Sequence, residues 1–132
     1  VDFKIFEPKH FPDPVTEKDV EFWKALRKKY KGLHHAKAGA RILEERGYPE
    51  VANMVRMHGF LQIGKGFDTW EQKILYYADK RTKHDTVVSL KERLEEGRQR
   101  NAPDMNPEES EKLNAQVYVL EKEILSEIAK IS

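Results

Sequence analysis

The sequence contains no cysteine, which excludes a disulfide scaffold and a zinc site built on thiolates. It has no apolar run near the ~18 residues of a membrane-spanning helix, so we expect no membrane partner. The formal net charge is only +1, and no basic stripe interleaved with aromatic residues is present. We therefore expect no nucleic acid polymer as a partner. The absence of cysteine fits a reducing compartment, and we expect a cytoplasmic protein.

The composition is that of a globular chain, with 39% hydrophobic and 36% charged residues. A chain of 132 residues is long enough for one domain with a buried core. Apolar residues recur at three- and four-residue spacing between proline- and glycine-containing breaks, which indicates an all-α fold. We expect an irregular segment over 1–15, a helical core over 16–100, and a long helix over 107–132 that packs on the core.

Capping signals place the starts of the expected helices at about residues 17, 35, 49, 70, 90 and 107. Thr16 is expected to cap the first helix. The pairs Thr69–Gln72 and Ser89–Glu92 have the spacing of capping boxes. Gly32 ends the first of these helices, and the segment 59–68 is expected to be a loop.

Apolar residues at helical spacing indicate which face of each expected helix turns inward. The last helix has such a repeat, near 3.5 residues, for about three heptads. We expect this helix to fold back on the core, with a dimer seam as the alternative. The expected inward residues are Val20, Trp23, Leu26 and Tyr30 in the first helix, Ala36, Ala40 and Leu43 in the second, Trp70, Ile74, Tyr77 and Ala78 in the fourth, and Leu113, Val117, Leu120, Ile124, Ile128 and Ile131 in the last.

His35, His58 and Asp79 stand near the ends of three expected helices. Imidazole and carboxylate groups from different helices are the donors with which an all-α scaffold assembles a divalent-metal site. The spacing is a weak signal, because 23 residues separate the two histidines, 21 separate His58 from Asp79, and no HExxH motif is present. A histidine at a helix C-terminus also interacts with the helix dipole. Asp79 has a second explanation as well, an ion pair with Arg81 or Lys83.

A sequence resemblance sharpens this interpretation. The string HHAKAGARILEERGYPEVANMVRMH, followed by KILYYADKR, resembles the C-terminal part of HD-superfamily metal-dependent phosphohydrolases over roughly residues 33–95. The resemblance implies an HD-type helical domain with His35, His58 and Asp79 as metal ligands. It implies a divalent metal cofactor (Mn, Fe or Mg) and a small phosphorylated substrate, a nucleotide or another phosphoester. Candidate substrate-binding residues beside the metal ligands are His34, Lys80 and Arg81.

The chain departs from the family in its upstream part. The first histidine and the adjacent His-Asp pair of the family have no match in residues 1–32, where His10 is followed by Phe11. His84-Asp85 is a literal His-Asp pair, but it follows Asp79, so it is assigned to capping or to the substrate side. The sequence therefore assigns no catalytic residue. We expect the C-terminal helices of a longer HD-type protein, with poor activity alone.

Two expectations about association and stability follow. Removing the family's first helices should expose apolar faces, so we expect a homo-oligomer or a complex with a complementing N-terminal polypeptide. The substitution Asp79→Ala is expected to abolish metal affinity at little cost in stability. The alternative function is a non-catalytic helical interaction or dimerisation module derived from an HD domain.

Overall fold

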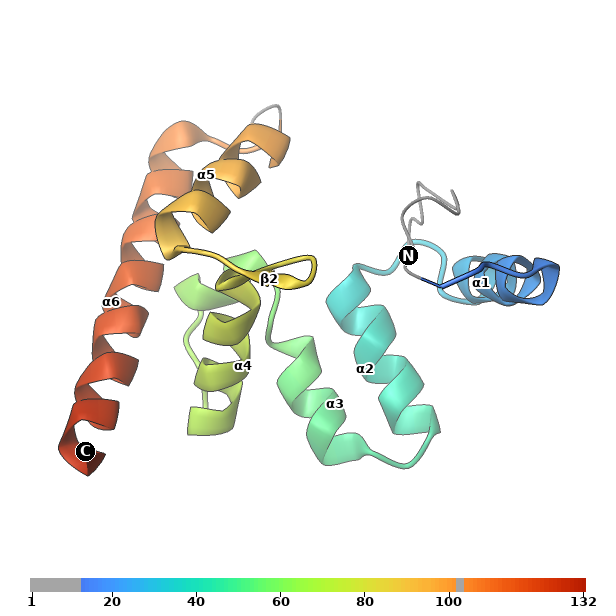
Figure 1. Ribbon diagram of the computed structural model, residues 1–132, viewed down its shortest axis with the longest axis horizontal. Helices are drawn as coiled ribbons and strands as arrows, with labels where there is room; N and C mark the ends of the chain where they lie inside the picture. Colours follow the sequence, from blue (N-terminus) through green and yellow to red (C-terminus); the bar gives the residue numbers. More distant parts are fainter. Residues whose placement is uncertain (1–12, 102–103) are drawn as a thin grey trace. The chain divides into compact units, whose positions relative to one another are not determined.

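The computed structural model describes residues 13–101 and 104–132, and these are mostly helical, which confirms the expected all-α class (Figure 1). Among these residues, no helix combines the length and the hydropathy needed to cross a bilayer. The elements are α1 (Glu17–Lys29), α2 (His35–Glu45), α3 (Pro49–Arg56), the 3-10 helix η2 (Phe60–Gly64), α4 (Trp70–Lys80), β1 (Thr82–Lys83), β2 (Thr86–Val87), α5 (Leu90–Asn101) and α6 (Pro107–Ile131).

The chain divides into two compact units, here called the N-terminal unit (Val1–Ala52) and the C-terminal unit (Asn53–Ser132). The division falls inside α3, between Ala52 and Asn53. His34 and His35 belong to the N-terminal unit, and His58, Asp79, Lys80 and Arg81 belong to the C-terminal unit.

The expected caps are present, but the Ser89–Glu92 pair, like Thr69–Gln72, shows only the bond from the later amide to the cap side chain. Thr16 accepts a hydrogen bond from the amide of Asp19, whose carboxylate accepts one from the Thr16 amide, so α1 begins with a complete capping box. Thr69 caps α4 by accepting from the Gln72 amide. The Gln72 side chain, however, accepts from the Asp68 amide rather than from Thr69, so the predicted box forms in one direction only.

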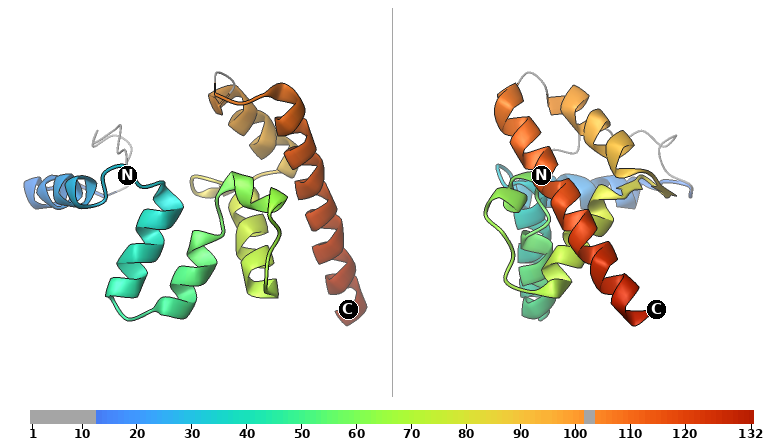
Figure 2. Two further views of the ribbon diagram at one scale, coloured as in Figure 1. Left: turned by 180° about the vertical axis from the view of Figure 1, so that it is seen from behind. Right: turned by 90° about the vertical axis from the view of Figure 1, so that its left-hand side faces the viewer.

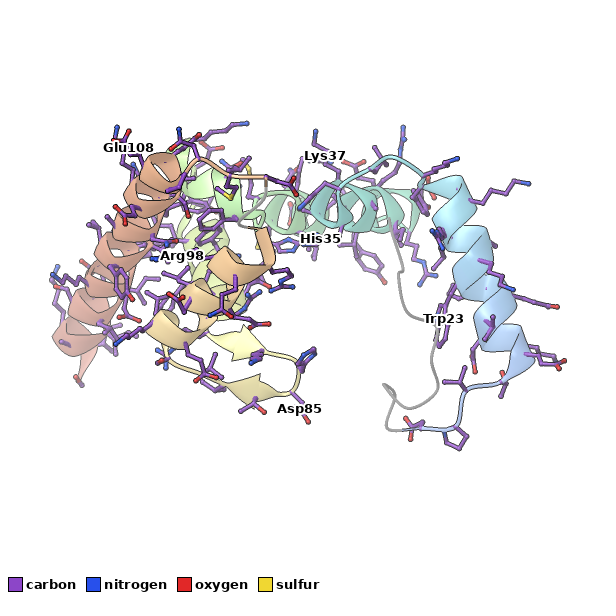
Figure 3. All side chains as sticks on the ribbon, turned by 90° about the horizontal axis from the view of Figure 1, so that it is seen from above. Trp23, His35, Lys37, Asp85, Arg98 and Glu108 are labelled. Atoms are coloured by element: carbon purple, nitrogen blue, oxygen red, sulfur yellow. The ribbon has the colours of Figure 1, made fainter. Side chains whose placement is uncertain are left out.

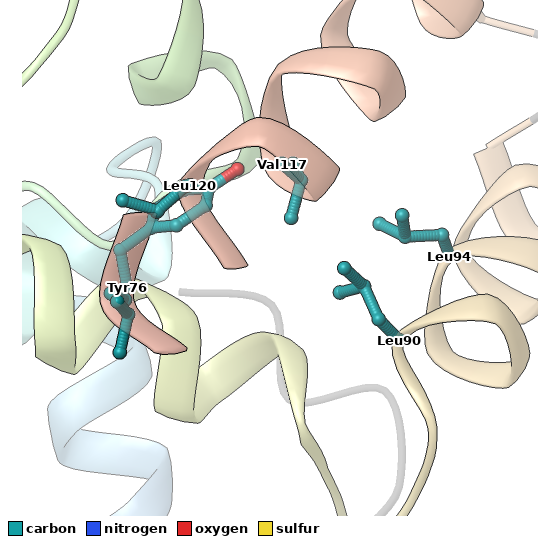
Figure 4. Close-up of a cluster of buried hydrophobic side chains, with 6 residues drawn as sticks. Tyr76, Leu90, Leu94, Val117 and Leu120 are labelled. Carbon is teal, nitrogen blue, oxygen red and sulfur yellow. The ribbon is translucent and has the colours of Figure 1, made fainter. Parts of the chain in front are cut away.

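In the C-terminal unit, α6 packs against η2, α4 and α5 (Figure 2). The core consists of six buried side chains from α4, α5 and α6 (Figure 4). The expected apolar stripe of α6 is buried from Leu113 to Ile124 but not beyond, because Ile128 and Ile131 are 54% and 87% exposed. The six core residues are Tyr76, Leu90, Leu94, Val117, Leu120 and Ile124.

The predicted inward face of α4 is wrong except for Tyr77, which packs partly buried against the core; the helix itself is where it was expected. Its buried residues are Gln72, Tyr76 and Lys80, which follow one another at four-residue spacing. Trp70 and Ile74 are 42% and 53% exposed. The segment was therefore correctly predicted to be a helix, but the face of the helix that turns inward was not correctly predicted. The buried face includes two polar side chains that find hydrogen-bond partners, Gln72 with the Asp68 amide and Lys80 at the site below.

The segment after α4 forms a short hairpin that the sequence did not indicate. Strands β1 and β2 pair antiparallel, with Thr82 opposite Val87 and Lys83 opposite Thr86. His84 and Asp85 form its two-residue turn (Figure 3), in which His84 adopts a left-handed backbone with φ of 56°. The literal His-Asp pair is therefore an exposed turn of this hairpin.

The N-terminal unit is held by polar contacts between the C-terminal ends of α1 and α2. Tyr30, which is buried, donates a hydrogen bond from its hydroxyl to Glu45 at 2.8 Å, and Lys29 pairs with the same carboxylate oxygen at 2.7 Å. The expected inward residues of α1 are half-buried or buried, as predicted. Gly32, at φ of 82°, makes the turn that ends α1, a conformation that glycine adopts without strain.

Candidate metal site

His58 follows the end of α3, and its ring is fixed by a backbone hydrogen bond. The Nδ1 atom lies 2.5 Å from the carbonyl oxygen of Val55. Because a carbonyl oxygen only accepts, Nδ1 is the donor, and the tautomer of the neutral ring that fits this contact has its lone pair on Nε2. Metal-binding histidines commonly donate their other ring N–H to a carbonyl in this way, which fixes the tautomer that ligates. The local geometry of His58 therefore suits a ligand that binds through Nε2.

Lys80 brings His58 and Asp79 together. Its ammonium donates to the Asp79 carboxylate at 2.5 Å and to the backbone oxygen of His58 at 3.3 Å. It also lies 4.6 Å from the ring centroid of Tyr76, a cation–π distance. The Lys80 ammonium thus links the Asp79 carboxylate to the backbone of His58, a residue 21 positions earlier in the sequence.

The Lys80 side chain is buried whereas Asp79 is partly open to solvent. The residue Lys80 is 6% exposed, and the Asp79 side chain is 38% exposed. Burial lowers the pKa of Lys80, and the neighbouring Asp79 charge opposes that shift. Lys80 was predicted to bind substrate, but here its ammonium compensates the charge of Asp79. A metal ion at Asp79 would have to replace or share this contact.

His34 and His35 lie at the start of α2, and Figure 3 labels His35. His34 is the N-cap, and its Nδ1 accepts from the Ala36 amide at 3.3 Å, a structural role that the sequence analysis missed. His35 is the first helical residue, and the two rings lie 4.1 Å apart. Both residues are exposed. His35 belongs to a different unit from His58 and Asp79, so convergence of all three stays a prediction.

Arg81, the third predicted substrate-binding residue, connects the hairpin to α6. It donates from Nε to the Val88 carbonyl and from Nη1 to the Tyr77 hydroxyl, both at 2.7 Å. The Tyr77 hydroxyl in turn donates to Glu121 at 2.6 Å. Burial raises the pKa of Tyr77, with a further increase from its hydrogen bond to Glu121. A phosphate at Arg81 would compete with this network.

The donor set was tested against the metal that the resemblance implies. The imidazole of His58 and the carboxylate of Asp79 are donors of the kind that such a metal accepts. Within residues 13–101 and 104–132, however, no group of three or more His, Cys, Asp or Glu side chains is arranged to hold a metal ion. The C-terminal unit thus offers a pair of donors, and a complete site requires further ligands.

No family model, no curated protein and no solved structure matches the chain. The resemblance to the HD superfamily therefore stays a prediction that rests on the residues quoted from the sequence.

Proposed function

We propose that the chain is part of an HD-type, metal-dependent phosphohydrolase that acts on a nucleotide or another small phosphoester. The observation that supports this proposal is that one ammonium, that of Lys80, contacts both the Asp79 carboxylate and the backbone carbonyl of His58. His58 would contribute Nε2 and Asp79 a carboxylate oxygen. His35 is the third ligand that the resemblance implies. A divalent metal ion in such a site supplies Lewis-acid polarisation of the phosphoester.

The residues of the chain have separate roles in this proposal. The Val55 carbonyl holds the His58 ring in the ligating tautomer. Lys80 compensates the Asp79 carboxylate while no metal is bound, which avoids an uncompensated charge beside the apolar core. Arg81 stands beside Lys80, where a guanidinium suits bidentate contact with phosphate.

Paramagnetic broadening by Mn²⁺ in two-dimensional NMR spectra tests the metal site in the 132-residue protein. We expect added Mn²⁺ to broaden the signals of His58 and Asp79 first. The substitution Asp79→Asn should weaken this effect at least about tenfold, since one charged ligand is lost. Asp85→Asn, an exposed aspartate in the hairpin turn, is the matched control and should leave the effect unchanged. Broadening that is absent, or equal in the two variants, would reject the site.

A second candidate function, a helical dimerisation module, is favoured by a different observation. The apolar stripe of α6 continues past the core to Ile128 and Ile131, which are exposed. Trp70 and Ile74 of α4 are exposed too, and the ion pair between Lys73 and Glu123 at 2.6 Å shows that these parts of α4 and α6 are neighbours. A second copy of the chain would bury this face. Exposed apolar groups gathered in one place are typical of association surfaces.

Analytical ultracentrifugation tests the second candidate. The substitution Ile128→Lys should convert a concentration-dependent dimer to a monomer. Val119→Lys is the matched control, because Val119 is 65% exposed and lies between the buried stripe positions Val117 and Leu120, on another face of α6. A monomer for the unsubstituted chain at all concentrations would reject dimerisation, and the Mn²⁺ experiment would remain an independent test of the first candidate.

A further inference from the structure

The net charge of the whole chain hides a strongly basic segment in the N-terminal unit. Residues 22–43 read FWKALRKKYKGLHHAKAGARIL and contain seven lysines and arginines but no aspartate or glutamate. All seven bases are exposed. The next acidic residues on either side are Glu21 and Glu44. The seven bases are Lys24, Arg27, Lys28, Lys29, Lys31, Lys37 and Arg41.

Most of these bases form no ion pair with the residues of the unit that the structure describes. Lys29 pairs with Glu45. Five others (Lys24, Lys28, Lys31, Lys37 and Arg41) form no ion pair with any residue in the part of the chain that the structure describes. Exposed basic side chains are stable in water without any ligand. A second feature is therefore needed to indicate what these bases would bind.

That second feature is a hollow between α1 and α2, inside the N-terminal unit. Its volume is about 290 Å³, just below the roughly 300–1,000 Å³ of typical small-molecule sites. The size therefore suits a single bulky side chain better than a free cofactor. The lining residues are Phe22, Ala25, Leu26, Lys29, Tyr30, Ile42, Glu45 and Arg46.

The wall of the hollow combines an apolar surface with a positively charged rim. Leu26 and Ile42 contribute aliphatic surface, and Phe22 is 52% exposed. At the polar side, Lys29 and Tyr30 both donate to the Glu45 carboxylate, and the Lys29 ammonium compensates its negative charge. The guanidinium of Arg46 forms no ion pair with the described residues, and it is a free cation at this rim.

The basic segment surrounds the same hollow. Lys28 is three positions from Ala25 on α1, and Arg41 is four positions from Glu45 on α2, so each lies on the helix face beside a lining residue. The Arg41 charge contributes to lowering the pKa of Glu45, after the hydrogen bonds from Lys29 and Tyr30, which places the guanidinium near the hollow. Positive charge therefore flanks the apolar surface on both helices.

We propose that this surface docks an acidic peptide segment of a partner protein, with one bulky apolar side chain in the hollow between α1 and α2 and carboxylates against Lys28, Arg41 and Arg46. Apolar anchors with complementary charges around them are the usual arrangement when a groove between helices binds a peptide. A nucleic acid backbone would match the charge but would leave the aliphatic surface of Leu26 and Ile42 uncovered. An anionic bilayer is too flat to fill a concave site.

Titration of the ¹⁵N-labelled, 132-residue protein with three synthetic helical peptides tests the proposal. The probe carries one phenylalanine among glutamates, one control replaces that phenylalanine by alanine, and the other replaces the glutamates by glutamine. We expect amide shifts at Ala25, Leu26 and Ile42 with the probe. Each control peptide should bind about 10- to 100-fold more weakly, because it lacks either the buried ring or the charge.

Substitutions in the protein sharpen the test. Ala25→Leu fills the hollow without introducing a helix-breaking residue. The double substitution Arg41→Glu/Arg46→Glu reverses the charge of the rim. Both substitutions should lower the affinity for the probe peptide at least about tenfold, a difference of ~1.4 kcal/mol in binding free energy. Lys65→Glu, at an exposed position of the C-terminal unit, should not. Circular dichroism confirms folding, and the rim variant keeps the test valid if Ala25→Leu does not fold.

The same titration also tests the other two possible ligands of this surface, a nucleic acid and an anionic bilayer. A single-stranded oligothymidylate and vesicles containing phosphatidylserine replace the peptide. The proposal is overturned if either binds more tightly than the probe and is insensitive to Ala25→Leu. It is also overturned if the probe shifts no residue of the hollow at about 1 mM, the concentration that half-fills a site worth ~4.1 kcal/mol.

Discussion

The two compact units bury different kinds of side chain. The C-terminal unit encloses a large aromatic ring and several branched aliphatic side chains, with Tyr76 and Val117 fully buried. In the N-terminal unit, the buried apolar residues among those described are Tyr30, Ala36, Ala38, Ala40 and Ala52. Since each buried methylene contributes about 0.8 kcal/mol, alanines contribute little. We expect the C-terminal unit to hold the more stable core.

The units also use charge differently. In the C-terminal unit, ion pairs link separate elements, such as Lys73 of α4 with Glu123 of α6 and Lys83 of β1 with Glu96 of α5. In the N-terminal unit, five bases between residues 22 and 43 have no such partner among the described residues. The N-terminal unit also joins two helices by an ion pair, Lys29 with Glu45, but most of its bases are presented at its surface. This difference separates a scaffold region from a candidate contact region.

The largest effect that would test this comparison is expected from Tyr76→Ala. Tyr76 is fully buried, and its hydroxyl donates to the Phe60 carbonyl at 2.9 Å. Truncation should cost about 3–5 kcal/mol of unfolding free energy, because it leaves a cavity in the core. In the N-terminal unit, Ala40→Gly should cost only about 1 kcal/mol. Urea unfolding measures both values, and equal costs would contradict a difference between the two cores.

Much of the local structure followed from short-range sequence signals. Thr16, Gly32 and Ser89 occupy the cap and turn positions that their side chains or backbone freedom favour, and the expected helices are present. These features depend on residues within one helical turn of one another. The sequence determines them without knowledge of the tertiary fold.

The buried face of α4 and the surroundings of Asp79 were not predictable in the same way. Hydrophobicity favoured Trp70 and Ile74 as inward residues, whereas the structure buries Gln72 and Lys80. Lys80 is buried because its ammonium finds a carboxylate, a carbonyl and an aromatic ring, two of which come from its own helix and one from 22 residues earlier. Such compensation depends on tertiary contacts, which the spacing of residues does not encode.

Asp79→Ala is expected to destabilise the protein by about 1–2 kcal/mol, because it leaves the buried Lys80 ammonium without its carboxylate. This pairing replaces the sequence-based expectation of little cost. The expected loss of unfolding free energy is small because the Asp79 side chain is 38% exposed, so solvent screens its charge. Chemical denaturation measures the loss. In the double variant Asp79→Ala/Lys80→Met, most of the stability should return, and a double variant as unstable as the single one would refute the role of the pair.

Lys80 also predicts a smaller, pH-dependent difference. Burial holds its pKa below the ordinary value of 10.5 in the folded protein, so the unfolded chain binds more protons between the folded and unfolded pKa values. Burying the ammonium therefore costs stability at neutral pH, and this cost is relieved as the pH rises towards 10.5. Relative to Lys80→Met, the unsubstituted protein should gain unfolding free energy between about pH 7 and about pH 10.

The measurement is confined to that interval for a reason within the same site. Burial raises the pKa of Tyr76, so above about pH 10 this tyrosine ionises first in the unfolded chain and destabilises the fold. Lys65→Met serves as the control for loss of an exposed charge. A constant difference between the unsubstituted protein and Lys80→Met over the whole interval would show that Lys80 is not the titrating group.

The smallest expected effect compares one paired and one unpaired lysine. Lys73 contacts Glu123 at 2.6 Å and lies 4.6 Å from the Trp70 ring centroid, so Lys73→Gln should cost about 0.2–1 kcal/mol. Lys28 has no counter-charge among the described residues and has basic neighbours in the sequence, so Lys28→Gln should be neutral or slightly stabilising, within about 0.5 kcal/mol. Salt should reduce both effects, since exposed charges are screened. Urea unfolding at low and high ionic strength measures the unfolding free energy of both variants. A larger loss for Lys28→Gln than for Lys73→Gln would mean that the basic segment stabilises its own unit, and the contrast between the two regions would then be wrong.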